Sequence, residues 1–342
     1  MKHLLNVLYI LTPDSYLYKQ GETICVKIGG EEKVRVPVHT IESIVCFGNT
    51  TVSTPFIEFC GERGVGLTFL SDYGKFYGRI SGPVHGNVLL RIRQYNLMKE
   101  NDKVINLSKN FVAAKIANSR NVLLRSAREH SDYQAQDSLR EAAKEMAIIA
   151  KDLNQVDSLD TLRGIEGLCA KHYFKVFDNL IKVNKDEFYF NARNRRPPMD
   201  NVNALLSFSY KLLTNDICSS LETIGLDVAA GFLHAVRPGR PSLALDILEE
   251  LRSPLCDRFV ISLINLKQLQ AKDFESGPDG VKLKKDGMRT LITAWQSRKK
   301  EEIVHPFIEE KIKIGLIPYV QAQLMARYLR GDIDAYPPFF WK

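Results

Sequence analysis

The spacing of apolar residues changes near residue 87, and this change most limits the folds open to the chain. Before it, short runs rich in β-branched and aromatic residues, such as Leu5–Leu11 and Thr23–Ile28, alternate with turn residues such as Gly29 and Gly30. After it, apolar residues recur at helical spacing over long stretches such as Val104–His130. The sequence therefore predicts an α+β protein, with a β-rich part followed by a helical part.

The predicted boundary divides the 342 residues into two domains. Residues 1–82 are predicted to form a small β-rich N-terminal domain, suited to pairing subunits or supporting DNA, with one helix at Thr54–Arg63. Residues 83–88 are the expected linker. Residues 89–342 are predicted to form a larger, all-α C-terminal domain that carries any catalytic site, with a small hairpin turn at Ser276–Gly280 between helices.

Composition narrows the class of protein only a little. The net charge of +7 comes from 47 basic and 40 acidic residues, so it favours an anionic partner mildly. The six cysteines are scattered without a CxxC pair, which indicates reduced core residues and neither a disulfide framework nor a thiolate zinc site. No apolar run approaches about 18 residues, so we expect no membrane association and a cytoplasmic protein.

The stretch Gly231–Arg252 contains the side chains best suited to metal binding and catalysis. Pro238 and Pro241 interrupt any helix after His234, and Pro241 is well placed as the first residue of a new helix that ends before Pro254. Apolar residues form one stripe of that helix, and the acids Asp246, Glu249 and Glu250 lie on its other side. An imidazole beside carboxylates at i and i+3 could bind one divalent cation. The alternative is an amphipathic helix with a solvated acidic edge.

The segment Ser158–Ile181 is predicted to be a second important helix. Glu166 lies on it between Gly164 and Gly167, which together cost about 1 to 2 kcal/mol of helix propensity relative to alanine. Two explanations are open for these glycines. They either allow close helix packing or let a phosphate approach Glu166.

Arginines gather near both acidic segments. One cluster precedes Pro197 and Pro198 in a stiff loop, a second follows His234, and one more arginine shares the helical face of Glu166. Guanidinium groups suit bidentate phosphate binding, so arginine clusters that flank an acidic site favour a ligand with several phosphates. The alternative is that these basic loops are only solvated. The candidate DNA-binding residues are Arg163, Arg193, Arg195, Arg196, Arg237 and Arg240.

The C-terminal segment YPPFFWK is strongly aromatic. Aromatic side chains of this kind serve as core packing, as an interface anchor or as a base-stacking platform. The sequence does not choose among these three.

Three blocks in this order resemble the catalytic core of the CRISPR-associated spacer-integration endonuclease family, the larger of the two core adaptation proteins. They are RGIEG at Arg163–Gly167, RRPPMDNVNALLSFSYKLL at Arg195–Leu213 and the stretch Gly231–Arg252. The resemblance covers nearly the whole chain. It implies that Glu166, His234 and Glu249 are the metal ligands, with Asp246 as a second catalytic acid and the alternative third ligand.

The resemblance also implies an activity and its partners. It implies a metal-dependent DNA endonuclease and integrase of prokaryotes that inserts short DNA fragments as new spacers into a CRISPR array by transesterification, with Mg²⁺ or Mn²⁺. The implied partners are double-stranded DNA, both fragment and CRISPR repeat, a second copy in a homodimer, and a small ferredoxin-like adaptation protein. Two other hypotheses remain open: a non-catalytic DNA-binding scaffold, and a small-molecule phosphohydrolase.

Overall fold

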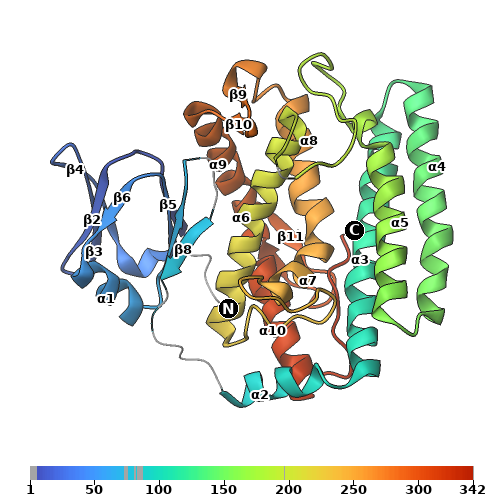
Figure 1. Ribbon diagram of the computed structural model, residues 1–342, viewed down its shortest axis with the longest axis horizontal. Coiled ribbons are helices and arrows are strands. Elements are labelled where there is room, and N and C mark those ends of the chain that lie inside the picture. The colour runs from blue at the N-terminus through green and yellow to red at the C-terminus, as the bar shows by residue number, and fades with distance from the viewer. Residues whose placement is uncertain (1–5, 73–75, 81, 83–87, 196, 342) are drawn as a thin grey trace. The chain divides into compact units, whose positions relative to one another are not determined.

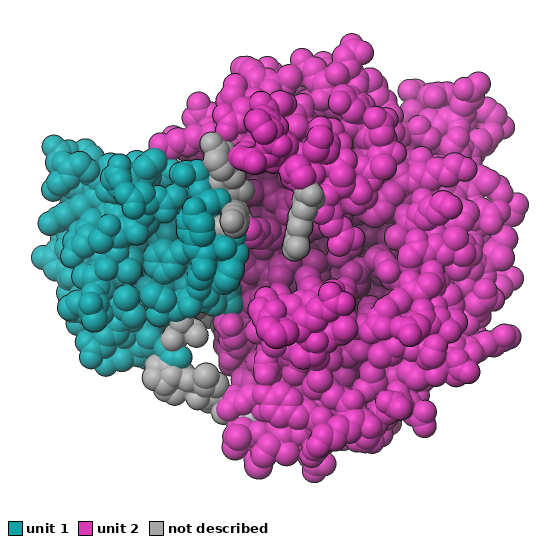
Figure 2. Space-filling view, in the orientation of Figure 1, with its two compact units in different colours: residues 1–85 teal, residues 86–342 magenta. Residues whose placement is uncertain are grey.

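A computed structural model describes the chain except residues 1–5, 73–75, 81, 83–87, 196 and 342. The contacts divide it into two compact units, Met1–His85 and Gly86–Lys342 (Figures 1 and 2). The predicted linker 83–88 lies outside the described residues except for Val88, which begins a helix.

In its described residues, the first unit contains two four-stranded sheets and one α-helix. The first sheet has the order β1 (Asn6–Ile10), β5 (Ile41–Phe47), β7 (Gly66–Leu70) and β8 (Phe76–Ile80). The second has the order β4 (Glu31–Pro37), β3 (Thr23–Ile28), β2 (Ser15–Gln20) and β6 (Thr50–Val52). Helix α1 (Thr54–Glu62) packs with them around a shared apolar core, which confirms the predicted helix in a β-rich region.

The second unit is mainly helical. Helix α3 packs against α4, α5 and α7, and α6 packs against α7 and α10. Figure 1 shows α3, α4 and α5 side by side. The helices are α2 (Val88–Leu97), α3 (Asn101–Glu129), α4 (Tyr133–Ile149), α5 (Leu159–Lys175), α6 (Asn201–Ile224), α7 (Ser242–Leu251), α8 (Arg258–Asn265), α9 (Lys285–Lys300) and α10 (Ile317–Arg330).

The prediction of an all-α second domain is wrong in one respect. The described part of this unit contains two antiparallel hairpins, β9 (Phe274–Gly277) with β10 (Gly280–Leu283) and β11 (Glu302–Val304) with β12 (Lys311–Lys313). The first confirms the hairpin turn expected at Ser276–Gly280. The second has strands of only three residues, too short for an alternating apolar pattern to show in the sequence.

Helix ends near the candidate residues follow the expected capping chemistry, with two differences. The carboxylate of Asp200 accepts a hydrogen bond from Asn203 N at 2.7 Å and caps α6. The predicted helix Ser158–Ile181 is shorter, since α5 ends at Lys175 and a 3-10 turn follows. After α7 the chain does not leave the helical path, because a π-helical turn, Arg252–Asp257, carries Pro254 directly into α8.

The described residues include no helix that is both long enough and apolar enough to cross a membrane. All six cysteines are buried with free thiols, as the scattered spacing predicted.

Candidate functional site

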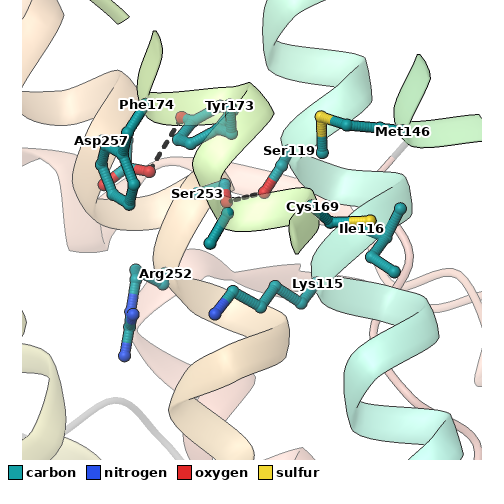
Figure 3. A pocket seen from close by; sticks show the side chains of 11 residues that line it. Lys115, Ile116, Ser119, Met146, Cys169, Tyr173, Phe174, Arg252, Ser253 and Asp257 are labelled. Carbon is teal, nitrogen blue, oxygen red and sulfur yellow. Dashed lines mark hydrogen bonds between the residues drawn. The ribbon is translucent and has the colours of Figure 1, made fainter. Parts of the chain in front are cut away.

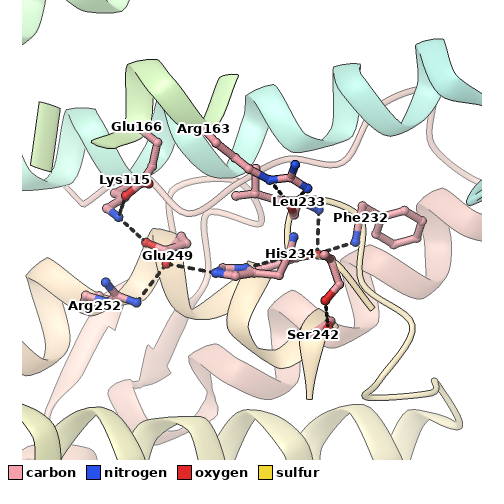
Figure 4. Close-up of polar contacts among 11 residues, drawn as sticks. Lys115, Arg163, Glu166, Phe232, Leu233, His234, Ser242, Glu249 and Arg252 are labelled. Atoms are coloured by element: carbon pink, nitrogen blue, oxygen red, sulfur yellow. Dashed lines mark hydrogen bonds and ion pairs between the residues drawn. The ribbon is translucent and has the colours of Figure 1, made fainter. Parts of the chain in front are cut away.

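Side chains from three separate segments line one pocket of about 330 Å³ in the helical unit. Figure 4 shows three of them, Glu166, His234 and Glu249, beside one another. Glu166 comes from α5, His234 from the loop between α6 and α7, and Glu249 from α7. Three of the six candidate arginines border the same pocket. Its lining residues are Arg163, Glu166, Leu233, His234, Ala235, Arg237, Arg240 and Glu249.

The acidic edge of α7 is buried, which contradicts the alternative of a solvated edge. Asp246 and Glu250 have 0% of their surface exposed and Glu249 has 4%. A buried carboxylate requires hydrogen bonds or positive charges around it. Each of the three acids therefore has a specific set of partners, and each set is different.

Asp246 holds the loop that carries His234. Its carboxylate accepts hydrogen bonds from the backbone N–H groups of Phe232 at 2.6 Å, Leu233 at 3.1 Å and His234 at 2.9 Å. It also lies 2.8 Å from His234 Nδ1, so Nε2 is the ring nitrogen left for chemistry. With four contacts on two oxygens, Asp246 is a positioning residue, and the geometry favours Glu249 as the third ligand.

Gly231 allows this loop to approach α7. A Cβ at this position would lie 2.6 Å from the carbonyl carbon of Ser242, closer than side chains tolerate. The glycine therefore lets the backbone of the loop reach the start of α7, where Asp246 binds the backbone of residues 232–234.

Glu249 is surrounded by positive charge. Its Oε1 lies 2.9 Å from Arg252 Nη2 and 3.8 Å from His234 Nε2, and its Oε2 lies 2.6 Å from Lys115 Nζ. Burial alone would raise the pKa of Glu249, but the charges of Arg252 and Lys115 outweigh burial and lower it to about 2. Glu249 is therefore ionised at any ordinary pH.

Lys115 is a site residue that the sequence reasoning missed. It comes from α3, is 8% exposed, and places its ammonium group against the carboxylates of both Glu166 and Glu249 (Figure 4). The available signal was a lysine inside the apolar run FVAAKIANS. Its two partners are 51 and 134 residues away, so only the fold identifies them.

Arg252 was also missed, and a buried network behind the pocket fixes it. Its guanidinium lies 4.9 Å from the ring centroid of Tyr210, whose hydroxyl donates to Asp257 at 2.6 Å. Tyr173 donates to the other oxygen of Asp257 at 2.8 Å. Figure 3 shows Arg252 and Lys115 projecting on the same side of this network. The π-helical turn supplies both Arg252 and Asp257, and so links the network to Glu249.

The six candidate arginines have different positions. Arg163 donates to the carbonyl of Leu233 at 2.8 and 3.1 Å, and thus also holds the His234 loop. Arg237 is exposed at the pocket and Arg240 is half-buried there. Arg195 is exposed outside the residues that line the pocket, and Arg196 lies outside the described residues.

Arg193 has an internal role. Its guanidinium donates to Asn203 Oδ1 at 2.7 Å and Ser207 Oγ at 3.0 Å, and lies 5.4 Å from the ring centroid of Tyr210. Burial lowers its pKa. These contacts bind the loop to α6, and they account for the arginine without a ligand.

Gly164 and Gly167 are not explained by packing within the described chain. A Cβ at either position would meet no atom of the described residues within 4 Å. No described residue thus supports the close-packing explanation, and the two glycines leave open space beside Glu166.

The residue types of the donor set, two carboxylates and an imidazole, suit one divalent ion, although Lys115 lies between the carboxylates. Within the described part of the chain no group of three His, Cys, Asp or Glu side chains has the spacing of direct ligands. The chemistry is nevertheless suitable: two carboxylates face an imidazole whose other nitrogen is fixed by Asp246. In addition, the buried Oε2 of Glu249 contacts Lys115 but accepts no hydrogen bond within the described residues. An ammonium group thus stands where a metal cation would balance the same charges.

Fold and pocket together define a class: a two-unit α+β protein whose helical unit carries a carboxylate–histidine site bordered by arginines. The family described as CRISPR associated protein Cas1 matches residues 8–297, and the chain belongs to this family of CRISPR-associated endonucleases.

One curated relative is a CRISPR-associated endonuclease Cas1 of Chlorobaculum tepidum, 49% identical over 100% of both chains. Two solved structures share the fold at 20% identity. A casposase bound to integration product has a TM-score of 0.83, over 99% of this chain and 95% of that one. A chain of a Cas6-RT-Cas1–Cas2 complex has a TM-score of 0.84, over 100% of this chain and 36% of that one.

Proposed function

We propose that the protein is a metal-dependent DNA endonuclease and integrase that inserts short DNA fragments into a CRISPR array. The observation that carries this proposal is that Glu166, His234 and Glu249 line one pocket together with Arg163, Arg237 and Arg240. Carboxylates and an imidazole suit Mg²⁺ or Mn²⁺, and guanidinium groups suit the phosphates of DNA. Membership of a family whose curated relatives are named endonucleases supports the nuclease assignment.

Each side chain has a task in this proposal. Glu166, His234 Nε2 and Glu249 would hold the divalent ion, which supplies a Lewis acid that polarises the target phosphate. Arg237 and Arg240, exposed and half-buried at the rim, would bind the flanking phosphates. Asp246 and Arg163 keep the His234 loop in place through the hydrogen bonds described above. Arg252 keeps Glu249 ionised and oriented.

Hydrolysis and integration would use the same residues. The outcome depends on whether water or the 3′-hydroxyl of a DNA fragment lies in line with the target phosphodiester. In transesterification the hydroxyl oxygen forms the new P–O bond while the old 3′-oxygen leaves, so one phosphodiester replaces another and no ATP is consumed. The casposase of similar fold is bound to integration product, which supports the joining reaction for a protein of this fold.

Partners form part of the proposal. The family resemblance supports a homodimer and a small ferredoxin-like adaptation partner, and one structural neighbour belongs to a complex that includes Cas2. The DNA substrates would be the double-stranded fragment and the CRISPR repeat. No described helix could cross a membrane.

The test separates the metal site from DNA binding. With Mn²⁺ or Mg²⁺, His234→Ala should reduce cleavage and joining of plasmid DNA by about a hundredfold or more, because loss of a direct ligand should cost at least as much as the roughly tenfold to hundredfold that loss of an outer-shell partner costs. Binding of duplex DNA should change little, because phosphate contacts supply most of its free energy. Arg237→Ala with Arg240→Ala should instead weaken binding and flatten its dependence on salt.

The other hypotheses give different results in the same assay. A DNA-binding scaffold would bind DNA equally well in chelator and would show no cleavage to lose. A small-molecule phosphohydrolase would act on phosphate esters and retain little duplex DNA. If the His234→Ala variant cleaved plasmid DNA as fast as wild type, the proposed site would be contradicted.

A further inference from the structure

A second and larger cavity, of about 700 Å³, lies beside α3 and shares no lining residue with the first pocket. Four arginines line it: Arg125 and Arg128 from α3, Arg140 from α4 and Arg258 from the start of α8. Arg125 and Arg128 follow Lys115 on α3 by 10 and 13 residues, so they begin about 15 to 20 Å farther along its axis. This arginine cavity is therefore separate from the pocket of Glu166, His234 and Glu249.

The arginine cavity keeps an excess of positive charge. Its lining residues include one acid, Glu129, which pairs with Arg125 at 3.1 Å. Arg140 has an exposed and loose pair with Asp137 at 3.7 Å. Arg128 and Arg258 have no ion pair with any other described residue. Four guanidinium groups thus have two carboxylate partners, Glu129 in the cavity lining and Asp137 outside it, and this excess of positive charge attracts a polyanion.

One wall of the arginine cavity is rigid. Two hydrogen bonds hold the backbone of Trp341. Its backbone N–H donates to Asn118 Oδ1 at 2.8 Å, and its carbonyl oxygen accepts from Asn121 Nδ2 at 2.8 Å. The guanidinium of Arg258 lies 5.0 Å from the Trp341 ring centroid. Burial, together with the charges of Arg125 and Arg298, lowers the pKa of Arg258 to about 10. Arg258 is thus a half-buried cation among like charges, which a bound anion would stabilise.

We propose that the arginine cavity binds the phosphodiester backbone of DNA and anchors it at a distance from the reacting phosphate. This inference rests on the proposed function, which makes DNA the polyanion that the protein meets. Residues three apart on a helix have Cβ atoms about 5 to 6 Å apart, so Arg125 and Arg128 present two guanidinium groups in a row. A row of such groups suits the repeated phosphates of a strand better than one small anion.

The test measures DNA binding without catalysis. Arg128→Ala and Arg140→Ala are compared with wild type by fluorescence anisotropy of a labelled DNA duplex, in EDTA and over a series of KCl concentrations. Each substitution should weaken binding several-fold and make the slope of log K against log salt shallower by about 1. The matched control is Lys144→Ala, which removes an exposed cation from α4 outside the cavity and should leave affinity and slope unchanged.

Two results would overturn the inference. One is that the Arg128 and Arg140 variants, folded by their melting temperatures, bind DNA with the affinity and slope of Lys144→Ala. The other is that they keep DNA binding but lose binding of polyglutamate, which would assign the cavity to an acidic protein segment. If wild type itself neither binds nor cuts DNA, the proposed function fails first. If wild type does both and the variants match it, only this inference fails.

Discussion

At the scale of single residues, Lys115 is the side chain that most changes the picture of the pocket. Its ammonium group bridges Glu166 and Glu249, at the place that a divalent cation would have to occupy to balance both carboxylates. Two cations cannot share this place without strong repulsion, which amounts to several kcal/mol at about 4 Å near a protein surface. We therefore expect Lys115 and the metal to compete.

Lys115→Met should separate the two roles of this lysine. The variant should bind Mn²⁺ at least about tenfold more tightly, because a competing charge worth about 1.4 kcal/mol or more is gone. Without metal it should lose stability, because the half-buried Glu166 and the buried Glu249 lose a shared partner. The loss should be smaller than the roughly 3 to 5 kcal/mol of a fully buried pair, since Arg252 still neutralises Glu249. Isothermal titration with MnCl₂ and denaturant unfolding measure the two effects.

An exposed lysine on the same helix provides the control. Lys103 is 58% exposed and pairs with Glu100 at 2.6 Å on the surface, so Lys103→Met should change neither quantity appreciably. Weaker or unchanged Mn²⁺ binding by Lys115→Met would show that the lysine supports the metal or has nothing to do with it.

The residue scale also shows what the sequence could reveal. His234 and the acids of α7 lie within sixteen positions, so their association was visible in the order of residues, and Glu166 was joined to them by resemblance. Lys115 and Arg252 could not be assigned to the site, because their partners come from other helices. Local pattern also gave no means to distinguish Asp246 from Glu249. Only the contacts show that Asp246 holds a loop while Glu249 faces the pocket.

At the scale of elements, the end of α7 departs most from expectation. Pro254 was expected to follow the end of a helix, and α7 does end at Leu251, yet the helical path continues through a π-helical turn. A wider turn accommodates proline, which has no N–H to donate. This turn brings Arg252 to Glu249 and Asp257 to its two tyrosines. A local irregularity thus builds the back of the pocket.

The C-terminal segment, residues 336–341, is hydrogen-bonded to both α3 and α7. Tyr336 and Phe339 are each 1% exposed, so they are core residues, while Trp341 lines the arginine cavity. Glu250 of α7 binds this segment, because its carboxylate accepts hydrogen bonds from the Tyr336 hydroxyl at 2.5 Å and from the Phe339 backbone N–H at 2.8 Å. Of the three explanations for the aromatic tail, core packing is confirmed for these two rings.

Glu250 should make stability depend on pH. Burial raises its pKa from 4.5 to about 7 despite its hydrogen bonds. The folded protein then keeps a proton that the unfolded chain has lost, so stability falls as pH rises from about 4.5 to about 7 and levels off above. Glu250→Gln should show a smaller fall than wild type between about pH 5 and about pH 8 in urea unfolding.

Glu141→Gln is the comparison for this experiment. Glu141 is 60% exposed on α4, so its replacement should leave the pH dependence as in wild type. If Glu250→Gln loses as much stability as wild type over the same interval, another buried group is responsible.

At the scale of the whole molecule, the division into a β-rich unit and a helical unit was predictable because the two periodicities differ over long stretches. The order of strands in the two sheets was not, since β1 pairs with β5 and β2 with β6 across intervening segments. The hairpin β11–β12 was missed because its strands are short. Long patterns reveal elements, while pairing depends on contacts far apart in sequence.

The central claim is that Glu166, His234 and Glu249 together bind one divalent ion. Anomalous diffraction from crystals of the protein soaked in MnCl₂ tests it most directly. The predicted result is one manganese peak within about 2.0 to 2.3 Å of the two carboxylates and His234 Nε2, with the Lys115 ammonium moved away from the carboxylates. A soaked crystal with no manganese in this pocket, and Lys115 still bridging Glu166 and Glu249, would contradict it.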